Sequence, residues 1–242
     1  MNKKKILTIA LAIALIAIMV TSSLAYFTDN DEVTNTFTVG SVLIDIWENN
    51  QITDEPEIEF DEPLIPVVDA ANPADDDNYV HKIIQVESNG ENPAYIRTHI
   101  AVPKALDGYL RLDVSLTGWT QHTYTTPATV DGVEYIVYTY DHTDAVAKDN
   151  FTSVLLKGVY LDSAADIKDN PDTPSADLEF CKPNGDGTYT FSGFVAHNKV
   201  TDGYTSNTVS VLVASQAIQA QGFDNAATAL NTGFGENTNP WR

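Results

Sequence analysis

The fold of this chain is decided by residues 79–102, which read YVHKIIQVESNGENPAYIRTHIAV. Two runs rich in β-branched and aromatic residues, 79–86 and 94–102, flank a polar turn that contains Asn-Gly and Asn-Pro pairs. Polar and apolar side chains alternate in the second run, so Arg97 and His99 share one face of the predicted strand. The segment is therefore typical of two β-strands joined by a turn.

Patterns of the same kind recur along most of the chain. Asp131-Gly132 and residues 184–187 favour the positive φ angles of tight hairpin turns. About eight or nine short strands separated by such turns predict an all-β chain, a two-sheet β-sandwich of the jelly-roll or Greek-key type. The other predicted strands lie within residues 42–47, 110–116, 135–140, 154–161, 189–196 and 209–218.

Acidic loops and a short helix complete the predicted fold. Residues 51–77 and 162–177 are rich in Asp, Glu and Pro, which is typical of long acidic surface loops. At most one or two short helices are expected. The best candidate covers residues 225–230, with Asp224 as its N-cap.

The first 25 residues have the pattern of a signal peptide. Three lysines precede an apolar stretch at residues 6–20, and the small residues Ser23 and Ala25 follow at the spacing that a signal peptidase recognises. We expect cleavage between Ala25 and Tyr26, so that residues 1–25 are removed and the mature protein is secreted without a stable membrane span. The alternative is a retained anchor, although this apolar stretch would reach only about 22 Å of a hydrocarbon core of about 30 Å.

Charge and cysteine content exclude several classes of function. The chain has 34 Asp and Glu against 13 Lys and Arg, a formal net charge of -21. Such a surface disfavours nucleic acid, whose phosphates need a basic patch. Removal of residues 1–25 takes away three basic residues and no acidic ones, so the expected mature charge is -24. A single cysteine excludes an intrachain disulfide and any multi-cysteine metal centre.

No arrangement of residues predicts an enzyme. None of the five histidines pairs with another at the spacing of two metal ligands on one helix face, and a polar sheet face is enough to explain His99. The lone Cys181 has no histidine base that the sequence points to. No hydrolase, P-loop or dinucleotide-binding motif is recognisable. We therefore expect a protein without catalytic residues and without a cofactor.

Calcium binding is the alternative to a protein without a cofactor. Ca²⁺ binds several oxygens that converge from loops, and Asp75, Asp76 and Asp77 place three carboxylates in one predicted loop. The aspartates of residues 162–177 offer a second set. Solvated acidic loops without an ion explain the same composition, so both interpretations stay open.

Three segments of the expected mature chain form a characteristic series. The first reads AYFTD at 25–29 and then NTFTVGSV at 35–42, the second spans 82–103 with NGENPAYIR at 89–97, and the third reads AIQAQGF at 217–223. Their order and spacing resemble those of the TasA/camelysin family of exported bacterial proteins. The resemblance spans the mature chain, while the middle of the chain is unmatched.

The resemblance implies a secreted structural protein that polymerises head to tail with itself into fibres of the biofilm matrix or cell surface, after processing by a signal peptidase. In such fibres the N-terminal strand of one subunit inserts into the sheet of its neighbour. Residues 26–41 would be the donor strand, 42–232 the jelly-roll sandwich and 233–242 a C-terminal tail. The donor side chains that suit pockets along a sheet edge are Tyr26, Phe27, Val33, Phe37 and Val39.

Other interpretations of these residues stay open. Residues 26–40 would equally suit the first strand of the subunit's own sandwich. A camelysin-like metalloendopeptidase is an alternative function, although the sequence shows no recognisable zinc motif. A monomeric surface-binding module for calcium or carbohydrate is another, in which Trp47, Trp119 and Trp241 are candidates for sugar stacking.

Overall fold

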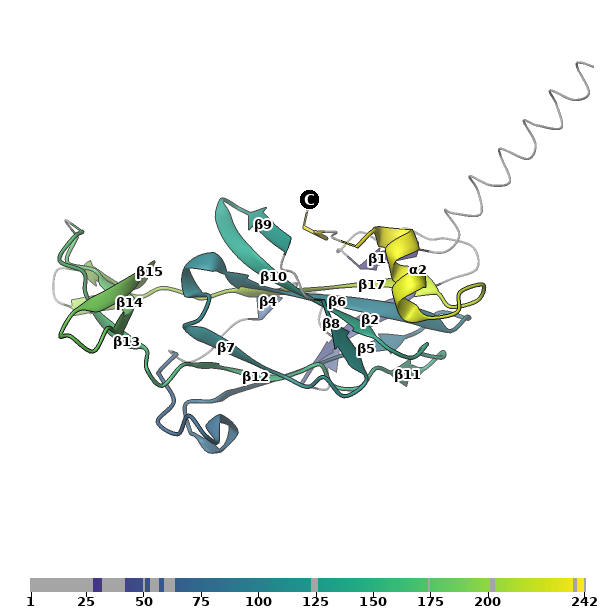
Figure 1. Cartoon of the computed structure of the whole chain (residues 1–242), viewed down its shortest axis with the longest axis horizontal. Helices are drawn as coiled ribbons and strands as arrows, with labels where there is room; N and C mark the ends of the chain where they lie inside the picture. Colours follow the sequence, from purple (N-terminus) through teal and green to yellow (C-terminus); the bar gives the residue numbers. More distant parts are fainter. Residues whose placement is uncertain are drawn as a thin grey trace, which may run out of the picture.

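The computed structural model consists mostly of antiparallel β-sheets, as the sequence predicts (Figure 1). It describes residues 28–31, 42–49, 51–52, 57–58, 64–122, 126–173, 175–200, 203–236 and 239–241. Within these ranges the chain forms three sheets, one α-helix (α2, Ala226–Phe234) and two short 3-10 helices, η1 (Pro73–Asp75) and η2 (Lys104–Leu106). None of these helices is long and apolar enough to cross a membrane.

Sheet A is built around β6 (Ala94–Pro103), which pairs with β17 (Val211–Gln219) on one side and β10 (Val133–His142) on the other. In this register Arg97 of β6 stands opposite Gln216 of β17 and Asp141 of β10. Four shorter strands complete the sheet: β1 (Thr28–Asp31) and β4 (Glu57–Ile58) beside β17, and β8 (Trp119–Gln121) and β9 (Thr126–Val130) beside β10.

Sheet B has the strand order β3-β2-β5-β12-β7, with β11 beside β5. Its strands are β2 (Ile44–Glu48), β3 (Gln51–Ile52), β5 (Val80–Ser88), β7 (Leu110–Val114), β11 (Asn150–Phe151) and β12 (Leu156–Leu161). The predicted alternation is confirmed at β2, where Ile44 and Ile46 are buried together with the preceding Val42.

Sheets A and B form two layers around one core (Figure 1). A single cluster of buried apolar side chains includes Ile96 and Ile100 from β6 and Ile84 and Val86 from β5. Residues 89–93 carry the chain from β5 in sheet B to β6 in sheet A, so the predicted turn connects the two layers and does not close a hairpin. Removal of this apolar surface from water stabilises the fold by roughly 25 cal/mol per Å².

Sheet C lies at one end of the molecule (Figure 1, green) and corrects the sequence-based prediction. Its strands are β13 (Asp166–Asp169), β14 (Leu178–Pro183), β15 (Tyr189–Val200) and β16 (Gly203–Ser206). β13 lies inside residues 162–177, so the prediction of a continuous loop there is wrong, and the strands are more numerous than the sequence suggests. Phe180 and Phe194 of this sheet pack on each other and belong to the same core as sheets A and B.

Local boundaries differ from the prediction in two further places. The N-cap of α2 is Asn225 and not Asp224, because the Asn225 side chain accepts a hydrogen bond from the Thr228 N–H at 2.9 Å. The helix extends to Phe234, so residues 233–234 are helical and not part of a tail. Residues 51–77 contain β3, β4 and η1 in addition to loops.

The predicted hairpin turns are confirmed. Asp131 and Gly132 have φ angles of 50° and 84°, and they join β9 to β10 in an antiparallel hairpin. Gly185 and Gly187 have φ angles of 83° and 91° in the turn between β14 and β15.

Candidate functional site: the edge of β17 and the adjoining polar cluster

Strand β17, which holds part of the third segment of the family resemblance, pairs with described residues of the first and second segments. Ile218 of β17 lies opposite Thr28 of β1 on one side and Tyr95 of β6 on the other. Beyond the end of β17, the Ala220 N–H donates to the carbonyl oxygen of Pro93 at 2.8 Å. Segments that are far apart in the sequence therefore lie side by side in sheet A.

The outer edge of β17 is covered by short strands in the described part of the chain. β4 pairs with Val211 and Leu212, and β1 pairs with residues 215–218. The inner edge, in contrast, pairs with β6 continuously from Leu212 to Gln219. All nine residues of β17 are buried. β17 is thus a core strand whose outer main-chain groups depend on short pairing segments, which is the situation in which another strand can add.

A buried ion pair lies on the face of sheet A that points away from the shared core. Arg97 is 0% exposed, and its Nε and Nη2 donate to the two carboxylate oxygens of Asp141 at 2.7 and 3.0 Å. Nη2 also donates to Asn231 Oδ1, and Nη1 donates to the Gly235 carbonyl oxygen, both at 2.7 Å. These bonds join β6, β10 and the C-terminal end of α2, and they compensate a charge that would be costly to bury alone.

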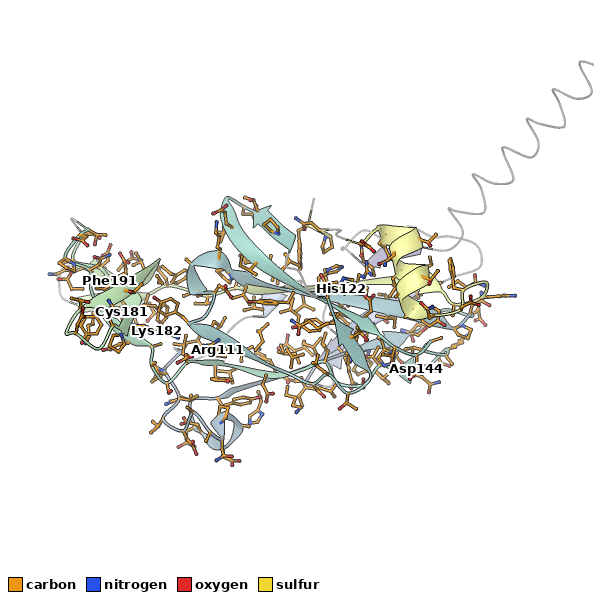
Figure 2. The ribbon with its side chains drawn as sticks, in the orientation of Figure 1. Arg111, His122, Asp144, Cys181, Lys182 and Phe191 are labelled. Atoms are coloured by element: carbon orange, nitrogen blue, oxygen red, sulfur yellow. The ribbon has the colours of Figure 1, made fainter. Side chains whose placement is uncertain are left out.

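Asp141 has a second partner in His122, whose Nε2 lies 3.1 Å from Asp141 Oδ2. Burial raises the pKa of the Asp141 carboxyl, but the hydrogen bonds from Arg97 and His122 outweigh that effect and hold the pKa below its usual range. Asp141 is therefore the counter-ion of Arg97 at neutral pH. Figure 2 shows His122 beside the strands of sheet A.

His99 extends the polar cluster along β6. Its Nδ1 lies 2.9 Å from Thr139 Oγ1, and its Nε2 lies 3.1 Å from Gln216 Oε1. Burial lowers the pKa of His99 to about 4, so the ring is neutral at pH 7. Trp241 packs edge-on against the same ring, with 6.3 Å between centroids. The sequence-based view of His99 as part of a polar sheet face is correct, but this face is buried.

Apolar side chains cover the polar cluster of Arg97, Asp141 and His99 at both of its ends. α2 packs against Ile218 of β17 through Ala226, Ala229, Leu230 and Phe234. At the other end, Trp241 packs against a buried cluster from β6, β9, β10 and β17. The C-terminal segment thus separates the Arg97 ion pair from solvent.

The residues predicted to direct processing and strand donation lie outside the described part of the chain. They are Ser23, Ala25 and Tyr26 at the expected cleavage site and Phe27, Val33, Phe37 and Val39 in the expected donor strand. Of residues 26–41, the structure describes Thr28–Asp31, which form β1 in sheet A of the same chain.

One of the three predicted calcium ligands, Asp76, has a local structural role. Asp76 accepts backbone hydrogen bonds from Asn78 through Oδ1 at 2.9 Å, and from Val68 and Asp69 through Oδ2 at 2.6 and 3.1 Å. These bonds lower its pKa, the one from Asn78 most. Within the described ranges, no three acidic, histidine or cysteine side chains are grouped so that they could hold a metal ion. The other two predicted ligands are exposed, namely Asp75 and Asp77.

A second set of charged side chains, Asp162, Arg111 and Lys182, links sheet C to the rest of the molecule (Figure 2). Asp162 Oδ2 lies 2.6 Å from Arg111 Nη2 and 3.2 Å from Lys182 Nζ, and Lys182 also donates to the Gly108 carbonyl oxygen at 2.7 Å. Next to Lys182, Cys181 is 0% exposed, and burial raises the pKa of its thiol. Cys181 is thus a packed thiol and not an activated nucleophile.

Trp119, one of the three candidates for sugar stacking, is also structural. It is buried, and its indole N–H donates to the Ser153 carbonyl oxygen at 3.0 Å. Trp47 is half-buried and donates to Glu87 Oε2 at 2.9 Å.

Comparisons of the chain with protein-family models, with curated proteins and with solved structures found no match.

Proposed function

We propose that the protein is a secreted structural protein that polymerises head to tail into extracellular fibres, with the N-terminal segment of one subunit adding to the β17 edge of the next. The sequence supports export through its signal-peptide pattern, and the TasA/camelysin resemblance supports a matrix or surface fibre. The proposal assigns no catalytic role to the chain.

The proposal includes a finer description of the fold, a two-sheet sandwich of the jelly-roll type. Its support is the path of the chain between the layers: β5, β7 and β12 lie in sheet B, whereas β6, β10 and β17 lie in sheet A. Along the sequence, these main strands therefore alternate between the two sheets. Such alternation is typical of a jelly roll.

The observation that carries the proposal is the pairing of β1 with β17. A four-residue strand from the N-terminal segment occupies the outer edge of a buried strand, in the register Thr28–Ile218 to Asp31–Ser215. The same segment from a neighbouring subunit would make the same main-chain hydrogen bonds. Because such a head-to-tail contact does not close on itself, it would generate a filament.

Deletion of residues 26–39 tests the proposal. The comparison is between protein that begins at Tyr26 and protein that begins at Gly40, examined by negative-stain microscopy, size-exclusion chromatography and circular dichroism. We expect filaments from the longer form, and a folded β-rich monomer from the shorter form, because the donor is absent while the acceptor edge is intact.

A peptide provides the matched control for that deletion. A synthetic peptide of residues 26–39 should bind the shortened monomer and stop elongation of the longer form, whereas a scrambled peptide of the same composition should do neither. Filaments from the shortened protein would refute strand donation. An unfolded shortened protein that the peptide does not restore would show that the segment is the first strand of its own subunit.

A further inference from the structure

Helix α2 lies over a buried cluster of charges while carrying no titratable side chain of its own. In the described part of the chain, Arg97 ties α2 and its C-cap to sheet A through the hydrogen bonds that it donates to Asn231 Oδ1 and to the Gly235 carbonyl oxygen. Apolar packing adds to this attachment, because four buried side chains of α2 cluster with Ile218 and with the partly buried Tyr95 and Phe223. The protonation states of the buried groups beneath the helix therefore decide whether water must enter this region to solvate a charge that has no partner.

The groups that face this cluster come from every neighbouring element. β6 supplies Arg97 and His99, β10 supplies Asp141, and the residue after β8 is His122. β17 contributes the neutral Gln216, whose amide oxygen bonds to His99. Tyr95 lies on the same face of β6 and packs against α2, Glu236 follows the helix, and Trp241 packs against His99.

We propose that α2 and the two residues that follow it, Gly235 and Glu236, form an acid-operated latch, which opens away from sheet A when protons enter the Arg97–Asp141–His99 cluster.

The charges of the cluster explain the direction of the switch. At neutral pH Arg97 is a cation, Asp141 is its anion, and the buried His99 is uncharged. While α2 is docked on sheet A, burial lowers the pKa of His99 from an ordinary value near 6.5 to about 4. The opened form therefore takes up a proton at a pH where the docked form does not, so docking is fully stable above pH 6.5 and weakens as the pH falls towards 4. The pKa of Asp141 is also lowered, so protonation of Asp141 further reduces the stability of the docked helix at still lower pH.

Opening of α2 is the least costly route for water to reach these charges. On its other side the cluster is backed by sheet A and the core that it shares with sheet B. α2 has nine residues and one apolar contact face, so its local opening costs less than separation of the sheets. Acid should then expose α2 while the sheets remain folded.

The test is native-state amide hydrogen exchange of the full mature chain at pH 7.5 and pH 4, corrected for the intrinsic exchange rates. We expect the opening equilibrium of residues 226–236 to rise by about 100-fold between the two pH values, because one proton with this difference in pKa is taken up on opening. The amides of β6 and β10 should keep their protection over the same range.

Two histidine variants separate the latch from general acid sensitivity. His99→Gln keeps a polar side chain but cannot be protonated, so it should reduce the rise at α2 to a few-fold. His197→Gln removes a partly exposed histidine of sheet C, which bonds Ser206 Oγ at 3.1 Å, and should leave the rise unchanged. An undiminished rise at α2 in folded His99→Gln protein would overturn the proposal.

If His99→Gln does not fold, a pH titration of the unmodified protein tests the proposal instead. In nuclear magnetic resonance spectra, the His99 ring and the α2 amides should change together, at a pH well below that of an exposed histidine. Titration of His99 near pH 6.5 with no change at α2, or loss of α2 signals only together with those of the sheets, would overturn the latch.

Discussion

At the scale of single residues, Gly158 in β12 makes room for an aromatic ring. A Cβ at this position would overlap Cζ, Cε1 and the hydroxyl oxygen of Tyr79. The ring has little freedom to move, because Tyr79 donates to Asp113 Oδ2 at 2.8 Å and stacks on Tyr160. We therefore expect Gly158→Ala to destabilise the protein by about 1–3 kcal/mol, the usual cost of overpacking, measured by urea unfolding.

Two further variants check the cause of that loss. Gly203→Ala adds a methyl group where nothing lies within 4 Å, and it should change the free energy of unfolding by less than about 0.5 kcal/mol. In a Tyr79→Ala background the cost of Gly158→Ala should largely disappear, because the clashing ring is gone. Equal costs in both backgrounds would contradict the explanation.

The polar cluster shows what a sequence can and cannot reveal about a residue. Alternation along residues 94–102 correctly places Arg97 and His99 on the face opposite Ile96. It says nothing about burial of that face, because the cover comes from α2, more than a hundred residues further along the chain. The signal that was available is the arginine itself: a charge in the middle of a strand-forming run needs a partner if it is buried.

At the scale of elements, the cap of α2 gives a direct comparison of two adjacent residues. Asn225 supplies the capping oxygen, and its neighbour Asp224 lies one residue before the cap. Asn225→Ala should therefore cost about 1 kcal/mol and increase hydrogen exchange in α2. Asp224→Ala is the matched control and should have little effect; the reverse order of the two effects would restore Asp224 as the cap.

Elements with strong local signals are predicted well, and those held by distant partners are not. The β9–β10 hairpin is predictable because Asp131-Gly132 imposes its turn. β13 reads Asp-Ile-Lys-Asp and has little strand propensity. It becomes a strand because β14 pairs with it from Asp166–Cys181 to Asp169–Leu178. The turn at residues 89–93 is predicted, but the choice between a hairpin and a crossing of layers depends on which strands pair.

At the scale of the whole molecule, net charge controls how filaments would associate. The full chain carries -21, and the expected mature chain carries -24. Raising the ionic strength from 0.01 M to 0.15 M shortens the screening length from about 30 Å to about 8 Å. If the protein polymerises as proposed, we expect single filaments at low salt and bundles at higher salt, with millimolar calcium acting at lower concentration than sodium. Light scattering and electron microscopy measure this, and salt-independent bundling would contradict it.

The single cysteine also has a practical consequence. Cys181 is fully enclosed in β14, and the chain contains no other thiol. A thiol reagent added to the native protein can therefore modify it only after β14 has left its neighbours. The rate of labelling therefore measures how often the structure around β14 opens, which gives this end of the molecule a kinetic probe without any engineered substitution.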